Sequence, residues 1–234
     1  MSKKGELRYQ RYGTIINNTS KRQEKSLDAS IINVISKIKE KFPKISIVHE
    51  KTIFINDIVN SLKKNFPQVS FHYYFDSSSM RPDGGILYIL SKDNQRYPIL
   101  IAEKKNQGTN DLRAKEGKSK QAKGNAIERL GKNVIGFRTA LLSESIFPFV
   151  CFGDGCDFDS SSSILDRVAT IAMFGQLNVE NLHNAGPNRE FNRGSFYFRK
   201  QEWTEEEMTQ RCYPIAEKSI FYYYSKYGKD IFLQ

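Results

Sequence analysis

Two apolar runs separated by a short polar stretch most constrain the fold of this chain. GILYIL spans residues 85–90, YPILIAEKK spans residues 97–105, and the polar stretch SKDNQR lies between them. Two such runs joined by a polar turn, with Asp93 and Asn94 near its tip, are typical of a β-hairpin. We therefore expect a hairpin that turns at about residue 94.

Short strands interleave with helices along the chain, which predicts a single α/β domain. Apolar residues at helical spacing predict helices over residues 27–42, from a cap at Asn56 or Asp57, from Asn125 towards Leu142, and over 164–174. Runs rich in β-branched and aromatic residues predict strands at 45–50, 69–75, 147–152 and 195–200.

The end of the chain carries the signals of one more helix. Thr204 and Glu207 form a T-x-x-E capping box, which marks a helix start. Pro214 is expected to kink or interrupt this helix, and Gly228 to end it.

The positive charge of the chain is concentrated in two stretches. The formal net charge is +10; residues 1–25 hold seven Lys/Arg and two Glu, and residues 104–138 hold ten Lys/Arg and three acids. Focused basic charge indicates either solvated loops or a surface that contacts phosphates. We expect residues 1–25 to be a flexible basic arm and residues 26–234 to be the folded domain.

Several protein classes are excluded. No apolar run approaches the ~20 residues of a membrane span, and MSKKGELRYQ lacks the apolar stretch of a secretory signal. Cys151, Cys156 and Cys212 have no zinc-site spacing and indicate reduced packing cysteines. We expect a cytoplasmic protein without a membrane partner.

Charged residues gather at one end of the expected hairpin. With a turn at residue 94, Asp83 lies opposite Lys105, and Glu103 shares one strand face with Lys105. Two carboxylates can hold Mg²⁺, with the carbonyl of Lys104 as a further ligand, and Lys105 can orient water and neutralise charge in phosphodiester hydrolysis. The alternative is a surface salt bridge.

The basic stretch ends in GNAIER, residues 124–129. Asn125 and Arg129 are one helical turn apart and share a face. Asparagine can bind adenine through two hydrogen bonds, arginine donates to purine N7 or guanine O6, and Gly124 permits a close backbone approach. The alternative is an ordinary helix start with Arg129 in an ion pair.

These blocks together resemble a known family. RPDGGI (81–86), LIAEKKNQG (100–108), KGNAIER (123–129) and LSESIFPFVCF (142–152) are similar, in order and spacing, to the EcoRI/MunI family of type II restriction endonucleases. The resemblance runs from about residue 30 to the C-terminus. It implies the restriction-endonuclease-like PD-(D/E)xK fold, a mixed central β-sheet flanked by α-helices, in a Mg²⁺-dependent homodimer.

The resemblance also implies residue roles. Asp83 and Glu103 correspond to the metal-binding carboxylates and Lys105 to the catalytic lysine. Asn125 and Arg129 correspond to the adenine-recognising pair. The remaining DNA-binding residues by resemblance are Ala122 and Ala126 near bases, Glu128 supporting the arginine, and Arg167 at the outer guanine. Lys123 and Lys104 depart from the family pattern, which has small residues there, and are expected to add charge near the DNA path.

The implied function is a type II site-specific deoxyribonuclease. It would cut double-stranded DNA at a palindrome containing AATT, GAATTC by resemblance, and leave 5′-phosphate ends. A cognate DNA methyltransferase acting on the same site would be its functional partner. Two alternatives stay open: a PD-(D/E)xK nuclease of repair or transposition, and a DNA-binding protein without catalysis.

Overall fold

A five-stranded mixed β-sheet forms the centre of the protein. The computed structural model describes residues 15–108, 110–120, 125–183 and 192–234. The β1–β4 and β4–β5 pairs are antiparallel, whereas the β5–β6 and β6–β7 pairs are parallel. The predicted mixed sheet is thereby confirmed. Its strands, in spatial order, are β1 (Ser46–Glu50), β4 (Gly85–Leu90), β5 (Arg96–Gly108), β6 (Phe149–Gly155) and β7 (Ser195–Arg199).

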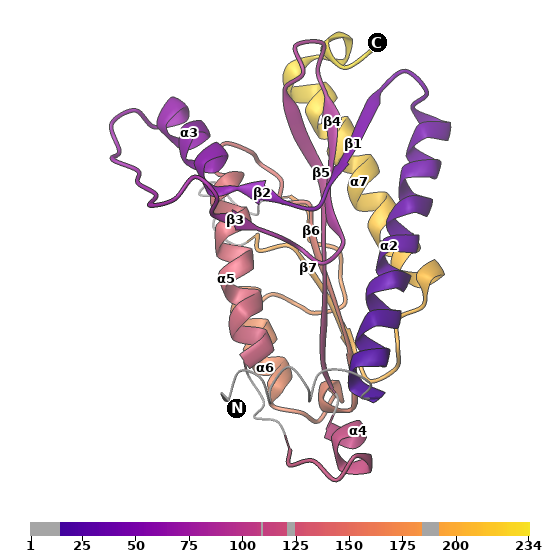
Figure 1. Ribbon diagram of the computed structural model, residues 1–234. Helices are drawn as coiled ribbons and strands as arrows, with labels where there is room; N and C mark the ends of the chain where they lie inside the picture. The colour runs from indigo at the N-terminus through magenta and orange to yellow at the C-terminus, as the bar shows by residue number, and fades with distance from the viewer. Residues whose placement is uncertain (1–14, 109, 121–124, 184–191) are drawn as a thin grey trace.

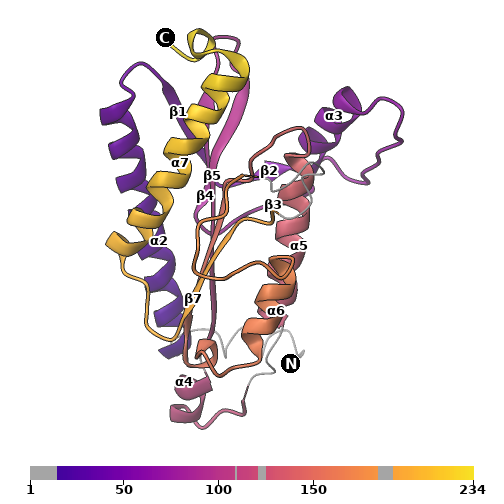
Figure 2. The same ribbon diagram turned by 180° about the vertical axis from the view of Figure 1, so that it is seen from behind.

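Helices cover both faces of this sheet (Figures 1 and 2). The helices α2 (Ile15–Lys41) and α7 (Glu205–Tyr227) lie on one face, and α5 (Asn125–Ala140) and α6 (Ile164–Ile171) on the other. Neighbouring residues of a strand point to opposite faces. Leu87 and Ile89 therefore join the α2/α7 core, and Ile86 and Tyr88 join the α5/α6 core. The run GILYIL is apolar throughout because both faces of β4 are buried.

The remaining elements are short. The strands β2 (Ile53–Phe54) and β3 (Ser79–Met80) pair with each other, and the helices are α3 (Ile55–Asn65), α4 (Asn110–Lys115), η1 (Cys156–Phe158) and η2 (Lys229–Ile231). The predicted cap of α3 is wrong, because Phe54 is the N-cap and makes no side-chain cap bond. Within the described ranges, no helix combines the length and apolar character needed to cross a membrane.

The β4–β5 hairpin turns where expected but in a different register. Asn94 adopts the left-handed conformation at the tip, with φ of 57°. Leu87 pairs with Leu100, whereas the next residue, Tyr88, pairs with Pro98. This irregularity shifts the ladder, and the register that follows it places Asp83 opposite Lys104 rather than Lys105. Proline cannot donate to the ladder, so an irregularity beside Pro98 is physically reasonable.

The first helix begins earlier than predicted. Helix α2 starts at Ile15, so residues 15–25 are helical rather than a flexible arm, and residues 1–14 lie outside the described residues. Tertiary contacts explain the difference. Gln23 is buried and donates to the Asp154 carboxylate at 2.5 Å, and Arg22 pairs with Glu202 at 2.7 Å. These contacts stabilise helix in a polar stretch that has no sustained apolar period.

The β-rich stretch 69–75 is not a strand. It lies in the connection between α3 and β3, where Tyr74 is 86% and Phe75 is 69% exposed. β-propensity reflects packing on a half-buried sheet surface, and these aromatic side chains lack that surface.

The capping box at the start of α7 is confirmed. Thr204 accepts a hydrogen bond from the Glu207 backbone, the Glu207 side chain accepts one from the Thr204 backbone, and Gly228 caps the other end with φ of 86°. The predicted interruption at Pro214 is wrong, because α7 continues through it. Buried residues on both sides, such as Cys212 and Ile215, hold the helix against the sheet.

The predicted end of the helix over residues 164–174 is also wrong. Helix α6 ends at Ile171, and Met173 and Phe174 adopt positive φ before Gly175.

The Glu207 carboxylate generates a stability prediction. Hydrogen bonds from Arg199 and from Thr204 lower the pKa of Glu207 from its ordinary 4.5 to about 2. A lowered pKa in the folded state means that ionised Glu207 stabilises the protein above pH 4.5, and that this stabilisation is lost as pH falls towards 2. We expect Glu207→Gln to lower the free energy of unfolding by about 1 kcal/mol at pH 7, measured by urea denaturation.

The loss of unfolding free energy in Glu207→Gln should become smaller as the pH is lowered. Glu206→Gln is the matched control, because Glu206 lies in the same helical turn and accepts an exposed hydrogen bond from Gln210. Equal deficits in the two variants, or a Glu207→Gln deficit independent of pH, would contradict the assignment.

Candidate active site

Charged side chains converge where β5 passes the start of β4. Asp83 follows Pro82 directly before β4, and Glu103 and Lys105 lie two residues apart on β5. The Lys105 ammonium donates to Asp83 Oδ2 at 3.3 Å and to Glu103 Oε1. The structure thus brings together the three residues to which the sequence assigned catalysis.

Backbone hydrogen bonds hold the two carboxylates in place. The Lys104 amide donates to Asp83 Oδ2 at 3.1 Å, and the Asp83 amide donates to Glu103 Oε2 at 3.2 Å. Each carboxylate is therefore bound by an amide from the other segment. This reciprocal pair orients the site even though the hairpin register differs from the predicted one.

The two carboxylates differ in burial. The side chain of Glu103 is 1% exposed, that of Asp83 33% and that of Lys105 14%. Burial raises the pKa of Glu103 and nearby Asp83 adds to this, while Lys105 opposes both. Burial acts to lower the pKa of Lys105, but the Glu103 and Asp83 carboxylates outweigh it and raise that pKa above its ordinary value. Lys105 is therefore a charged hydrogen-bond donor at neutral pH.

Helix α5 contributes one residue that the sequence analysis missed. The Asn133 amide nitrogen donates to Glu103 Oε1 at 3.1 Å. Asn133 lies one helical turn after Arg129, so helical spacing from the GNAIER block was the signal that could have found it.

Lys104 occupies the opposite face of β5. Its side chain is 1% exposed, and its ammonium lies 3.1 Å from Asp154 Oδ2 in an ion pair that lacks hydrogen-bond alignment. Asp154 also accepts hydrogen bonds from Gln23 and from the Trp203 backbone. The expectation that the Lys104 charge faces the DNA path is wrong, because strand alternation directs this side chain into the α2/α7 core.

The structure describes only part of the predicted DNA-binding set. Glu128 and Arg129 are exposed on α5, and Arg167 is exposed on the adjacent α6. Asn125 and Ala126 are the first two residues of α5. Ala122, Lys123 and Gly124 lie outside the described residues.

The cysteine nearest the site has the predicted packing role. Cys151 pairs with Glu103 across the β5–β6 ladder and is fully buried. Burial raises the pKa of its thiol well above the ordinary value. A protonated buried thiol contributes packing and no nucleophile.

Comparison with known families decides the identity of this fold. The family model of restriction endonuclease EcoRI matches residues 10–164, which is more than half of the chain and includes both carboxylates, Lys105 and the start of α6. This chain belongs to the EcoRI restriction endonuclease family.

Two curated type II restriction enzymes are similar to the chain. The type II restriction enzyme RsrI of Cereibacter sphaeroides is 27% identical over 241 residues, covering 88% of this chain and 87% of RsrI. The type II restriction enzyme EcoRI of Escherichia coli is 31% identical over 138 residues, covering 56% of this chain and 50% of EcoRI. The protein is accordingly a type II restriction endonuclease, a class that cuts double-stranded DNA at specific sites, and the predicted EcoRI-like resemblance is confirmed.

The donor set of this EcoRI-family site suits a hard divalent metal ion. Among the residues that the structure describes, no group of three or more His, Cys, Asp and Glu is arranged to hold a metal. Mg²⁺ does not require such a group, because it keeps several waters and is bound through one or two carboxylates. The Asp83 and Glu103 carboxylates supply that number.

The buried ion pair between Lys104 of β5 and Asp154 of β6 generates a further prediction. Removing one partner leaves the other charge buried and unpaired, so we expect Asp154→Ala to lower the free energy of unfolding by about 3–5 kcal/mol. The double variant Lys104→Met/Asp154→Ala should recover much of that loss. Urea denaturation of the two variants measures both effects.

Asp159→Ala is the matched control for this experiment. Asp159 pairs with Lys200 at 3.3 Å on the surface, where the two side chains are 40% and 59% exposed. Loss of this exposed pair should lower the free energy of unfolding far less than loss of Asp154 does. Equal effects of the two single variants would contradict a structural role for the buried pair.

Proposed function

We propose that this endonuclease cuts double-stranded DNA at a short palindrome with AATT at its centre, GAATTC as the full site, and leaves 5′-phosphate ends. The observation that carries the proposal is the cluster of Asp83, Glu103 and Lys105, linked through Asn133 to the helix that begins with Asn125. One helix thus contacts the hydrolytic cluster and contains Asn125 and Arg129, the residues assigned to base recognition.

Mg²⁺ is the cofactor we propose, held by the carboxylates of Asp83 and Glu103 and the carbonyl of Lys104. When bound, such an ion lowers the pKa of a coordinated water and stabilises negative charge on the phosphate. Lys105 remains protonated beside both carboxylates, so its ammonium donates to water or to a phosphate oxygen. Water attacks phosphorus and loses a proton to solvent, the bond from phosphorus to O3′ breaks, and O3′ takes up a proton to become a 3′-hydroxyl. The 5′-phosphate stays on the downstream fragment.

Base recognition is assigned to the start of α5 and to α6. Asn125 and Arg129 have the donors and acceptors that bind adenine and purine N7 in the major groove. Arg167 is assigned to the outer guanine and Glu128 to supporting Arg129. Ala122, Lys123, Gly124 and Ala126 are assigned to the neighbouring contacts with bases and backbone.

A palindromic site implies a symmetric enzyme. Two copies related by a two-fold axis present the same helix to each half-site. We therefore propose a homodimer. Because the enzyme would also cut the host's own GAATTC sites, a DNA methyltransferase acting on this sequence is its functional partner.

Charge-neutral variants of the carboxylates test the hydrolytic assignment. We expect Asp83→Asn and Glu103→Gln each to reduce plasmid cleavage in Mg²⁺ by at least about 1,000-fold, because metal-ion stabilisation worth several kcal/mol is lost. Sequencing the fragment ends of the wild-type digest identifies the site and the cut position. Glu217→Gln, on α7 and paired with Lys41, is the control and should cut normally.

Full activity of either carboxylate variant would overturn the assignment. Random fragment ends from the wild-type enzyme would refute cleavage at a palindrome. Binding without cleavage in Mg²⁺ would instead indicate a non-catalytic protein.

Alanine variants of the α5 residues test base recognition. We expect Asn125→Ala and Arg129→Ala to reduce discrimination at the adenine positions by roughly 10- to 100-fold, since each bidentate contact is worth about 1–3 kcal/mol. Cleavage rates on duplexes with single base changes measure this discrimination. Unchanged ratios in both variants would remove α5 from base recognition.

A further inference from the structure

The carboxylate of Glu103 is held by donors from three parts of the chain. Oε2 accepts from the Asp83 amide at 3.2 Å, and Oε1 accepts from Lys105 and from the Asn133 side chain at 3.1 Å. The Asp83 amide belongs to the turn before β4, Lys105 to β5, and Asn133 to α5. Asn133 is thus the contact through which α5 reaches the catalytic strand.

Asn133 and Lys105 differ in what they can do for Glu103. Lys105 has a long flexible side chain and contacts the Asp83 and Glu103 carboxylates at the same time, so it cannot set the orientation of either one independently. Asn133 has a short side chain on a helix, and losing rotamer freedom costs it less. Because its amide is uncharged, Asn133 also orients the Glu103 carboxylate without neutralising the negative charge that a metal ion would bind.

The position of α5 is itself fixed against the site. Three side chains of α5 are fully buried against the sheet, those of Leu130, Val134 and Phe137. Gly136 lets the helix approach Met80, because a Cβ at position 136 would overlap the Met80 sulfur. Met80 lies three residues before Asp83, so the same helix abuts the segments that carry both carboxylates.

We propose that Asn133 is a positioning residue that orients Glu103 for metal binding and makes the catalytic strand sensitive to the placement of α5. This inference rests on the proposed function, because it assigns Glu103 to the metal. Arg129 and Asn133 are one turn apart on α5, so a displacement of the helix on DNA displaces both side chains.

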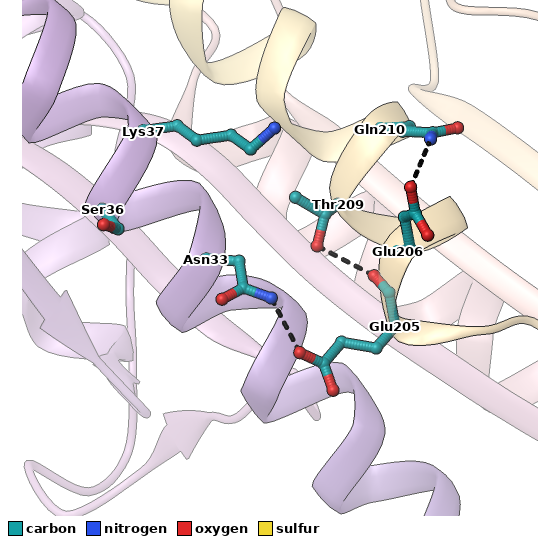
Figure 3. Close-up of a pocket in the computed structure, with 7 residues that line it drawn as sticks. All are labelled: Asn33, Ser36, Lys37, Glu205, Glu206, Thr209 and Gln210. Atoms are coloured by element: carbon teal, nitrogen blue, oxygen red, sulfur yellow. Dashed lines mark hydrogen bonds between the residues drawn. The ribbon is translucent and has the colours of Figure 1, made fainter.

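A matched pair of asparagines permits a controlled test. Asn33 of α2 donates a hydrogen bond of 2.7 Å to the Glu205 carboxylate of α7. Figure 3 shows this pair, which lies on the sheet face opposite α5. Asn33→Ala removes the same kind of hydrogen bond as Asn133→Ala at a place unconnected with the site. Asn133→Gln keeps an amide donor and serves as the conservative variant.

The experiment measures metal binding apart from turnover. Mn²⁺ is titrated into each full-length protein without DNA and the free ion is followed by electron paramagnetic resonance. Single-turnover cleavage is then measured as a function of Mg²⁺ concentration, alongside DNA affinity without metal and the midpoint of thermal unfolding.

We expect Asn133→Ala to weaken Mn²⁺ binding and to slow cleavage at limiting Mg²⁺ by about 10- to 100-fold, the range for a hydrogen bond to a charged group. DNA affinity should change less than about twofold, because the hydrogen bond to Glu103 contributes to the metal site and not to phosphate contacts. Asn133→Gln should recover part of both losses, and Asn33→Ala should match the wild type.

Three results would overturn the proposal. The first is that Asn133→Ala binds Mn²⁺ as tightly as the wild type, and the second is that Asn33→Ala loses as much Mn²⁺ affinity as Asn133→Ala. The third is that Mn²⁺ affinity falls in these variants only in proportion to a lowered midpoint of thermal unfolding. Failure of the wild-type enzyme to cut DNA would instead refute the proposed function, and the Mn²⁺ titration would still decide whether Asn133 supports a metal site.

Discussion

The rest of the site is organised around a carboxylate that lies inside the protein. Transfer of an ionised carboxylate out of water is costly unless charge and hydrogen bonds compensate it. Glu103 obtains this compensation from Lys105, from the Asp83 amide and from Asn133. These partners come from separate segments, so the site exists only when the turn before β4, strand β5 and helix α5 are all in place. Assembly of the site therefore depends on the tertiary packing of these three segments.

Much of the fold was predictable because its signals are local. The two apolar runs predicted the hairpin, and the Thr204–Glu207 pair predicted the start of α7. The hairpin register was not predictable from turn position alone, because the shift between Leu87 and Tyr88 changes the pairing by one residue. The helical state of residues 15–25 depends on contacts made by Gln23 and Arg22 with distant residues. No local pattern contains that information.

The site residues divide in the same way into those that local sequence signals predict and those that depend on distant contacts. Asp83, Glu103 and Lys105 could be placed together because strand geometry brings the ends of a hairpin into contact despite an error of one residue. The burial of Lys104 follows from the same alternation, since a neighbour of two site residues must point to the other face. Its partner Asp154 could not be foreseen, because β6 lies far along the chain. Asn133 required the three-dimensional packing of α5 on β5.

The alternation of Glu103, Lys104 and Lys105 also protects the strand against slippage. Apolar residues stand on both faces of β5, so hydrophobic burial distinguishes poorly between neighbouring registers. A slip of one residue would turn the Lys104 side chain to the sheet face of Asp83 and the Glu103 side chain to the sheet face of Asp154. The site would keep an ammonium group, lose one of its two carboxylates, and set two acids against each other in the core. The polar pairs on the two faces of β5 thus favour one alignment of the strand, the alignment that brings Asp83, Glu103 and Lys105 together.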